Sequence, residues 1–156
     1  MLLVLILIGT HTGMLAAGFL IGIYVLPILT APKGPDVAAL QATVTRALYK
    51  GRFERNLKGS DRLHWGEGEV RALADSIAHE GRLAPGPDYK LYLAPEFVDT
   101  KDGFLAVKDT SRRIGDVRTF NGFIVDLPAG VDLGAYTTVV VWCEAFSQFI
   151  SAAKYR

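Results

Sequence analysis

The chain has 156 residues, enough for one ordinary domain, and half of them are hydrophobic, which excludes a disordered protein. The 17 Lys and Arg residues nearly balance the 16 Asp and Glu residues, and a net charge of +1 leaves no cationic surplus for a polyanion. We therefore expect no nucleic-acid partner. The single cysteine, Cys143, excludes an internal disulfide, a CxxC pair and the CxxCH haem-attachment motif.

The first 32 residues contain no charged side chain. As a helix, residues 2–29 extend about 42 Å, which is enough to cross a hydrocarbon core of about 30 Å. No basic residue precedes this run, and it is about twice as long as the apolar stretch of a cleaved secretory signal. We predict an uncleaved signal anchor in the lipid bilayer that occupies residues 1–30 and ends near Leu29.

Small residues and one histidine lie along this predicted membrane helix. The pairs Gly9/Gly13 and Gly18/Gly22 have the four-residue spacing that lets a second helix approach closely in lipid. His11 falls on the same stripe as Gly18 and Gly22 and is a candidate functional residue, because an ionisable group is costly in a membrane. A hydrogen bond to a neighbouring helix, or a place near the interface, also accounts for His11. We expect other membrane protein subunits to pack here.

Residues 31–46 are predicted to form a connector that contains a short helix. Pro32 and Pro35 cannot continue the membrane helix. Apolar residues at three- and four-residue spacing predict a helix over residues 37–50, and Asp36 stands where it can cap that helix.

From residue 47 to residue 156 the pattern changes to short segments bounded by Gly, Pro, Asn and Asp, which is typical of strands. The predicted strands are 51–55, 63–74, 90–94, 104–107, 118–120, 123–126, 137–143 and 147–153. They indicate an all-β sandwich or barrel. Segment 137–143 (TTVVVWC) has no charge, so we expect a central strand buried on both faces, with Val141 and Cys143 on one face and Val140 and Trp142 on the other.

The order of several motifs resembles the electron-transfer DM-thirteen domain over about residues 47–155. The motifs are Gly51-Arg52-Phe53; His64 followed by Gly66, Gly68 and Val70; Gly86-Pro87-Asp88 before Leu91-Tyr92-Leu93; Gly115 and Phe120; and Val141-Trp142-Cys143 followed by Phe146, Phe149 and Ala152. The resemblance implies an all-β domain of membrane and exported proteins, often found beside haem-binding DOMON-type domains. It also implies a proposed redox role for the cysteine.

The resemblance implies a domain on the periplasmic or extracellular side of the cytoplasmic membrane. Lys33, Arg46 and Lys50 follow the helix, and the positive-inside rule alone would keep them in the cytoplasm. These charges are few, so we predict a single-pass protein with an exported C-terminal domain. Because this chain carries no second domain, we predict no cofactor of its own, and any haem or pigment would belong to a partner.

Cys143 is the candidate redox thiol, and its neighbours argue for a different role. A reactive thiol needs a depressed pKa and access, whereas the apolar Trp142 precedes Cys143 and Glu144 adds a negative charge after it. A buried, inert cysteine is the alternative. We expect Trp142 to lie in the sheet core as well, and we predict that any binding site is bordered by His64, Asp88, Tyr92 and Trp142.

The catalytic and metal signatures are incomplete. His79-Glu80 lacks the second histidine of the HExxH motif, no GxSxG motif occurs, and Gly66-Glu67-Gly68 lacks the third glycine of a dinucleotide loop. We predict no metal site, no identifiable small-molecule substrate and no enzyme activity. The leading hypothesis is an accessory subunit of a membrane electron-transfer assembly, of respiratory or photosynthetic type. The alternatives are a purely structural or interaction module, and a thiol redox sensor that uses Cys143.

Overall fold

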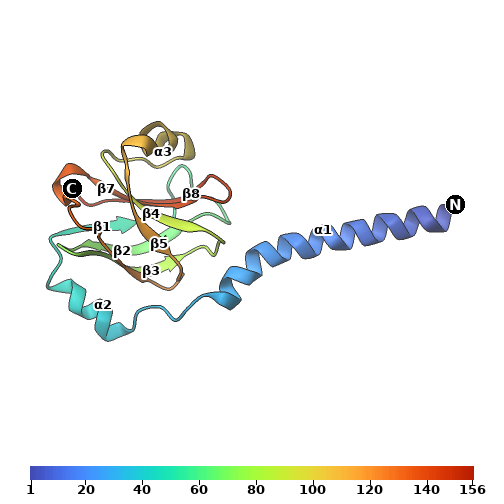
Figure 1. Ribbon diagram of the computed structural model, residues 1–156, viewed down its shortest axis with the longest axis horizontal. Coiled ribbons are helices and arrows are strands. Elements are labelled where there is room, and N and C mark those ends of the chain that lie inside the picture. The colour runs from blue at the N-terminus through green and yellow to red at the C-terminus, as the bar shows by residue number, and fades with distance from the viewer.

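A computed structural model describes all residues, 1–156, and separates the chain into a long helix and a β domain (Figure 1). Helix α1 (Leu2–Thr30) extends away from the domain, and none of its residues is buried. It is long and apolar enough to cross a membrane. The predicted helix is confirmed and continues to Thr30, with Pro27 inside its last turns. The hydroxyl of Thr30 donates to the carbonyl of Leu26 at 2.8 Å near this end.

Helix α2 (Val37–Val44) follows an extended connector, and its predicted cap is confirmed. The backbone N–H of Ala39 donates to Asp36 Oδ1 at 2.7 Å. The helix ends six residues earlier than the predicted residue 50, because the chain enters strand β1 (Tyr49–Phe53). Arg71 contributes to this end, since its Nη1 donates to the carbonyl oxygen of Leu40 at 3.4 Å and to Thr43 Oγ1 at 3.2 Å.

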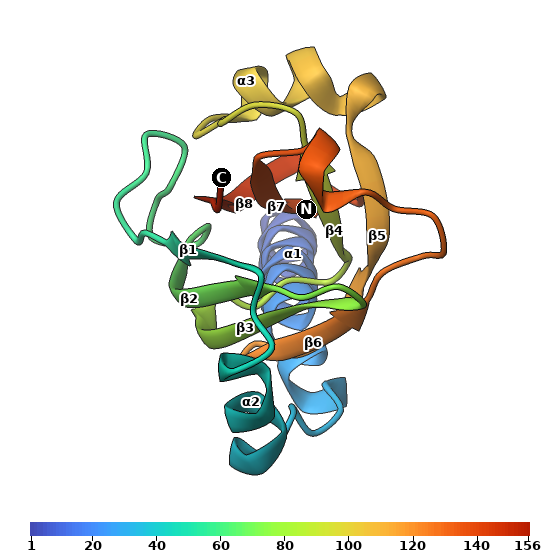
Figure 2. The ribbon, with the colours of Figure 1, turned by 90° about the vertical axis from the view of Figure 1, so that its left-hand side faces the viewer.

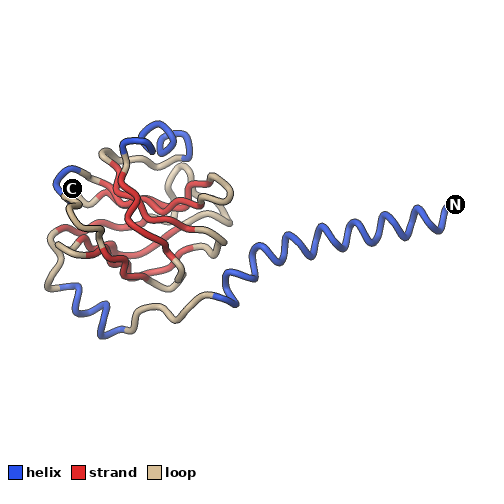
Figure 3. The backbone as a smooth tube through the Cα atoms, viewed as in Figure 1, coloured by secondary structure: helices blue, strands red, loops and turns tan.

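Two antiparallel sheets of four strands form the domain, which confirms the predicted all-β class (Figures 2 and 3). The first sheet has the order β1-β2-β3-β6, with β2 (Gly66–Ala72), β3 (Ser76–Leu83) and β6 (Phe123–Asp126). The second has the order β5-β4-β7-β8, with β5 (Arg112–Val117), β4 (Tyr89–Ala94), β7 (Thr138–Cys143) and β8 (Gln148–Lys154).

The predicted central strand is confirmed as β7, which lies between β4 and β8 and is buried at all six residues. Val141 and Cys143 face the core between the two sheets. Val140 and Trp142 face the other side, where a second apolar cluster contains Phe104 of helix α3 (Lys101–Val107). The outer face of this sheet is therefore partly covered by α3, seen above the strands in Figure 2.

Four strand predictions need correction. Residues 104–107 form part of α3, because the Thr100 hydroxyl accepts the N–H of Gly103 at 3.1 Å and starts a helix that buries Phe104. Residues 118–120 form no strand, since β5 comes before them. The first two predicted strands, 51–55 and 63–74, are observed as 49–53 and 66–72.

Strand β3 is absent from the prediction because its sequence, SIAHEGRL, mixes apolar and charged residues. The structure explains the mixture: His79 is fully buried, while Glu80 reaches the side chain of Arg71 on β2, with Nη2 and Oε2 2.6 Å apart. Two short 3-10 helices, η1 (Lys108–Thr110) and η2 (Leu133–Ala135), complete the chain.

Candidate functional site around Cys143

Cys143 ends β7 at the edge of the inter-sheet core, next to the turn that leads into β8. It pairs across the sheet with Tyr89 of β4 and Gln148 of β8, and only 2% of its surface is exposed. The tight turn after it includes Ser147, whose φ of 46° is the only positive value at a non-glycine residue. The sulfur is thus fixed by two neighbouring strands and a turn.

Burial raises the pKa of the Cys143 thiol, and the charge of Asp88 acts in the same direction. The backbone N–H groups of Phe146, Asp88 and Ala145 oppose this rise, because they stabilise a negative sulfur. The rise prevails, so the folded chain holds a protonated thiol at neutral pH. Such a thiol is a poor nucleophile until a partner or a local movement changes its surroundings.

A cavity of about 180 Å³ lies between this end of the domain and α1. Cys143, His64 and Tyr89 line it from the domain, while Ile23 and Tyr24 line it from the helix. The structure therefore brings together two of the predicted site residues, Cys143 and His64. It also adds α1 as one wall, which the sequence pattern did not indicate.

His64 is held in place by Asp61. The backbone N–H groups of Leu63 and His64 donate to Asp61 Oδ1 at 2.7 and 2.8 Å, and the His64 ring Nδ1 lies 2.8 Å from Asp61 Oδ2. Burial by itself would raise the pKa of Asp61, but the hydrogen bonds from His64 and Leu63 lower it. The loop before β2 thus fixes the imidazole at the cavity wall.

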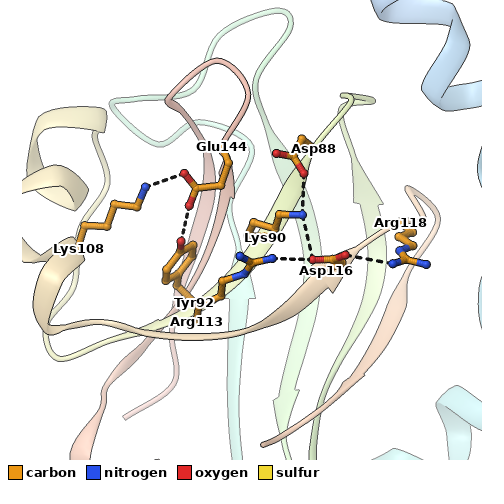
Figure 4. Close-up of polar contacts among 8 residues, drawn as sticks. All are labelled: Asp88, Lys90, Tyr92, Lys108, Arg113, Asp116, Arg118 and Glu144. Carbon is orange, nitrogen blue, oxygen red and sulfur yellow. Dashed lines mark hydrogen bonds and ion pairs between the residues drawn. The ribbon is translucent and has the colours of Figure 1, made fainter.

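Tyr92 and Trp142 belong to a different cluster, on the outer face of the second sheet. The Tyr92 hydroxyl donates to Glu144, whose other oxygen lies 2.7 Å from Lys108 Nζ (Figure 4). That ammonium also lies 5.2 Å from the centre of the Trp142 ring. Burial first, and then Glu144, raise the pKa of Tyr92. These two predicted residues do not line the Cys143 cavity.

Asp88 lies beside Cys143 without lining its cavity, and it belongs to a third group of charged residues. Its backbone N–H lies near the Cys143 sulfur, whereas its carboxylate lies 2.6 Å from Lys90 Nζ. Lys90 in turn lies 2.9 Å from Asp116 on the neighbouring strand β5 (Figure 4). Sequence reasoning missed Lys90 and Asp116, and only the pairing of β4 with β5 brings them opposite each other.

The four glycines of α1 have open space around them. A side chain built at Gly9, Gly13, Gly18 or Gly22 would meet no atom within 4 Å. At about 100° per residue, the first pair lies on the opposite face from the second. His11 Nδ1 lies 2.8 Å from the carbonyl oxygen of Leu7, one turn earlier in the same helix. Two glycine faces are therefore available to neighbouring helices.

No group of three or more His, Cys, Asp and Glu side chains in the chain is arranged to hold a metal ion. His79 lies on strand β3, inside the core between the rings of Phe53 and Phe123. It does not line the cavity to which His64 belongs. The two histidines are consequently not joined in one site.

The fold and the site together define a class of protein. It has a long apolar helix followed by a two-sheet β domain, with a buried cysteine at the end of a central strand. Residues 56–155 match the family described as Electron transfer DM13, and the chain belongs to this family. The match covers every strand of the domain except β1. Searches of curated proteins and of solved structures gave no match.

Proposed function

We propose that this protein is a membrane-anchored, non-catalytic accessory subunit of a membrane electron-transfer assembly of respiratory or photosynthetic type. Helix α1 acts as an uncleaved anchor, and the β domain lies on the periplasmic or extracellular side. The observation that carries the proposal is the position of Cys143, at a cavity that Ile23 and Tyr24 of α1 also line. Membership of the electron-transfer family supports the redox part.

The partner side of the proposal rests on α1. A side chain built at Gly9, Gly13 or Gly18 would meet no atom within 4 Å, so these positions can pack against other membrane subunits, whereas Gly22 lies in a groove that Pro87 of the domain also lines. A haem or pigment that exchanges electrons with the domain belongs to such a partner.

The first experiment extracts the untagged protein from its own membranes in mild detergent and records native size with the visible absorption spectrum. We expect it to migrate with a larger, coloured complex. Gly18→Leu should release it, whereas Ala17→Leu, which adds similar bulk on another face, should not. A small colourless species, unchanged by Gly18→Leu, would refute the accessory role.

The side of the membrane is tested by labelling a single introduced cysteine. Thr110 is exposed at the end of η1, the short helix that follows α3, and native Cys143 is buried. Thr110→Cys should react with a membrane-impermeant maleimide in intact cells as fully as in broken cells. Reaction only after the cells are broken would place the domain in the cytoplasm and contradict the proposal.

A purely structural role for Cys143 is the second candidate, and the raised pKa of the thiol favours it. Cys143→Ser distinguishes the two, because the nearby backbone N–H groups can donate to a hydroxyl oxygen. Lost electron transfer with unchanged melting supports a redox thiol. Unchanged electron transfer excludes a redox role for the thiol and leaves a structural role for Cys143.

A further inference from the structure

A polar cavity of about 240 Å³ lies between the end of α1 and the turn before β4. Lys90 is the central charge of this cavity, 2.6 Å from Asp88 and 2.9 Å from Asp116. Arg118 and Arg113 also approach Asp116, at 3.1 and 3.0 Å (Figure 4). This cluster of three cations and two carboxylates has a net charge of +1, and Lys90 and Arg118 are the cations that line the cavity.

The two cations that line the cavity keep hydrogen-bond donors free. Arg118 keeps 74% of its side chain exposed and makes one side-chain hydrogen bond, to Asp116. A guanidinium has five N–H donors arranged in a planar fork that matches a phosphate. The Lys90 ammonium has three donors and two carboxylate partners, so one donor is left over. The free N–H donors of Arg118 and Lys90 therefore suit an anion such as a phosphate group.

An apolar groove of about 510 Å³ runs along α1 beside this cavity. Phe19 and Leu26 form its sides, and Gly22 leaves space where another residue would fill it. Pro27 and Pro87 line both the groove and the polar cavity, so the two are neighbours. Their volumes together fall within the range of about 300–1,000 Å³ typical of ligand pockets.

The depth of the two spaces in a bilayer matches their chemistry. The helix is about 42 Å long and a hydrocarbon core is about 30 Å thick, so its last turns leave the core at the headgroup level. The polar cavity lies at those last turns, at Pro27 and Thr30. The groove begins two turns earlier, at Phe19. The polar cavity thus lies at the depth of a lipid headgroup, and the groove lies at the depth of its acyl chains.

We propose that the junction of α1 and the β domain binds one glycerophospholipid. Its phosphate diester carries one negative charge and pairs with Arg118 and Lys90, while an acyl chain follows the groove past Gly22. The inference rests on the proposed insertion of α1 in a membrane. Free phosphate shares the headgroup chemistry, but it leaves the apolar groove empty.

The test is native mass spectrometry of the full chain in detergent, titrated with phosphatidylglycerol. We expect one tightly bound lipid per chain. Arg118→Glu should weaken binding by about tenfold or more, because it replaces an attractive charge with a repulsive one. Arg112→Glu is the matched control: this exposed arginine lies at the other end of β5, makes no ion pair and should bind lipid like the native chain.

The groove is tested by Gly22→Phe, which should also reduce lipid binding. Gly13→Phe, on another part of α1 with equally open surroundings, should have no effect. Equal binding by the native chain and Arg118→Glu would overturn the proposal. Displacement of the lipid by inorganic phosphate, or binding of phosphate alone with no lipid, would identify a free-anion site instead. These measurements need no partner complex, so they fail independently of the accessory role.

Discussion

The buried histidine of β3 makes the stability of the domain depend on pH. His79 is fully buried, and its ring Nε2 lies 3.0 Å from the carbonyl oxygen of Glu67, which requires a proton on that nitrogen. Its Nδ1 has no partner. Burial lowers the pKa of His79 to about 4, although the Glu67 carbonyl and the charge of Glu80 act in the opposite direction. The folded chain therefore holds this ring neutral.

The size of the effect follows from the two pKa values. The histidine gains a proton near pH 6.5 when unfolded and near pH 4 when folded. Between these values only the unfolded state takes up the proton, so the free energy of unfolding falls as pH falls, by about 1.4 kcal/mol per pH unit. Between pH 6.5 and pH 4 the free energy of unfolding falls by roughly 3 kcal/mol in total, and about 2 kcal/mol of this is lost by pH 5. For a domain of this size, that lowers Tm by about 10 °C.

The assay compares the melting of the native chain and His79→Phe by circular dichroism between pH 7.5 and 5. Phenylalanine keeps an aromatic ring between Phe53 and Phe123 and removes the titrating group. The native chain should lose about 10 °C more than the variant. Asp116 does not interfere, because hydrogen bonds, first from Lys90, lower its pKa to about 2 and its contribution is lost only in more acidic solution.

His64 and His11 remain in both proteins, so the difference between their pH profiles isolates His79. Parallel profiles would refute the reasoning, because they would mean that the folded state accepts a proton on this ring as readily as the unfolded state does.

Three further measurements test the fold and the site. Gly68→Ala should destabilise the domain by more than about 2 kcal/mol, because Gly68 has a φ of 124° and a Cβ there would lie 2.3 Å from a backbone oxygen. Gly130→Ala should cost about 1 kcal/mol, because Gly130 has a φ of 79° and open space around it. Equal urea midpoints for the two variants would contradict this prediction. Phe149→Ala should lower the free energy of unfolding by about 3–5 kcal/mol, because the Phe149 ring is fully buried. Phe146→Ala should change it little, because Phe146 is half exposed. Equal melting temperatures for the two variants would contradict this prediction. Iodoacetamide should alkylate Cys143 far more slowly in the folded chain than in urea at pH 8; equal rates, followed by mass spectrometry, would show an accessible thiol.

The helices and the most apolar strands could be predicted from the sequence because each depends on a local pattern. The uncharged run of α1 predicts its length, and Asp36 predicts the start of α2. Strand β7 has only residues that favour strands, so its burial and its two faces follow from alternation alone. In each of these cases, neighbours in the chain supply the information.

The elements that were wrong depend on partners far along the chain. β3 carries a histidine and a glutamate that look exposed, yet the rings of Phe53 and Phe123 enclose the first and Arg71 binds the second. Residues 104–107 (FLAV) form a short apolar run like that of a buried strand, but the cap at Thr100 starts a helix there.

The sequence by itself determined the long apolar helix, the all-β class and the single cysteine, and it carried the motifs of the Electron transfer DM13 family. These follow from composition, periodicity and motif order, which need no distant contact. Only the tertiary structure decided that Cys143 and His64 share a cavity with α1, and that Tyr92 joins Glu144 and Lys108 beside Trp142. The physical reason is that successive side chains of a strand point to opposite faces, and only the packing of sheets and helix decides what each face meets.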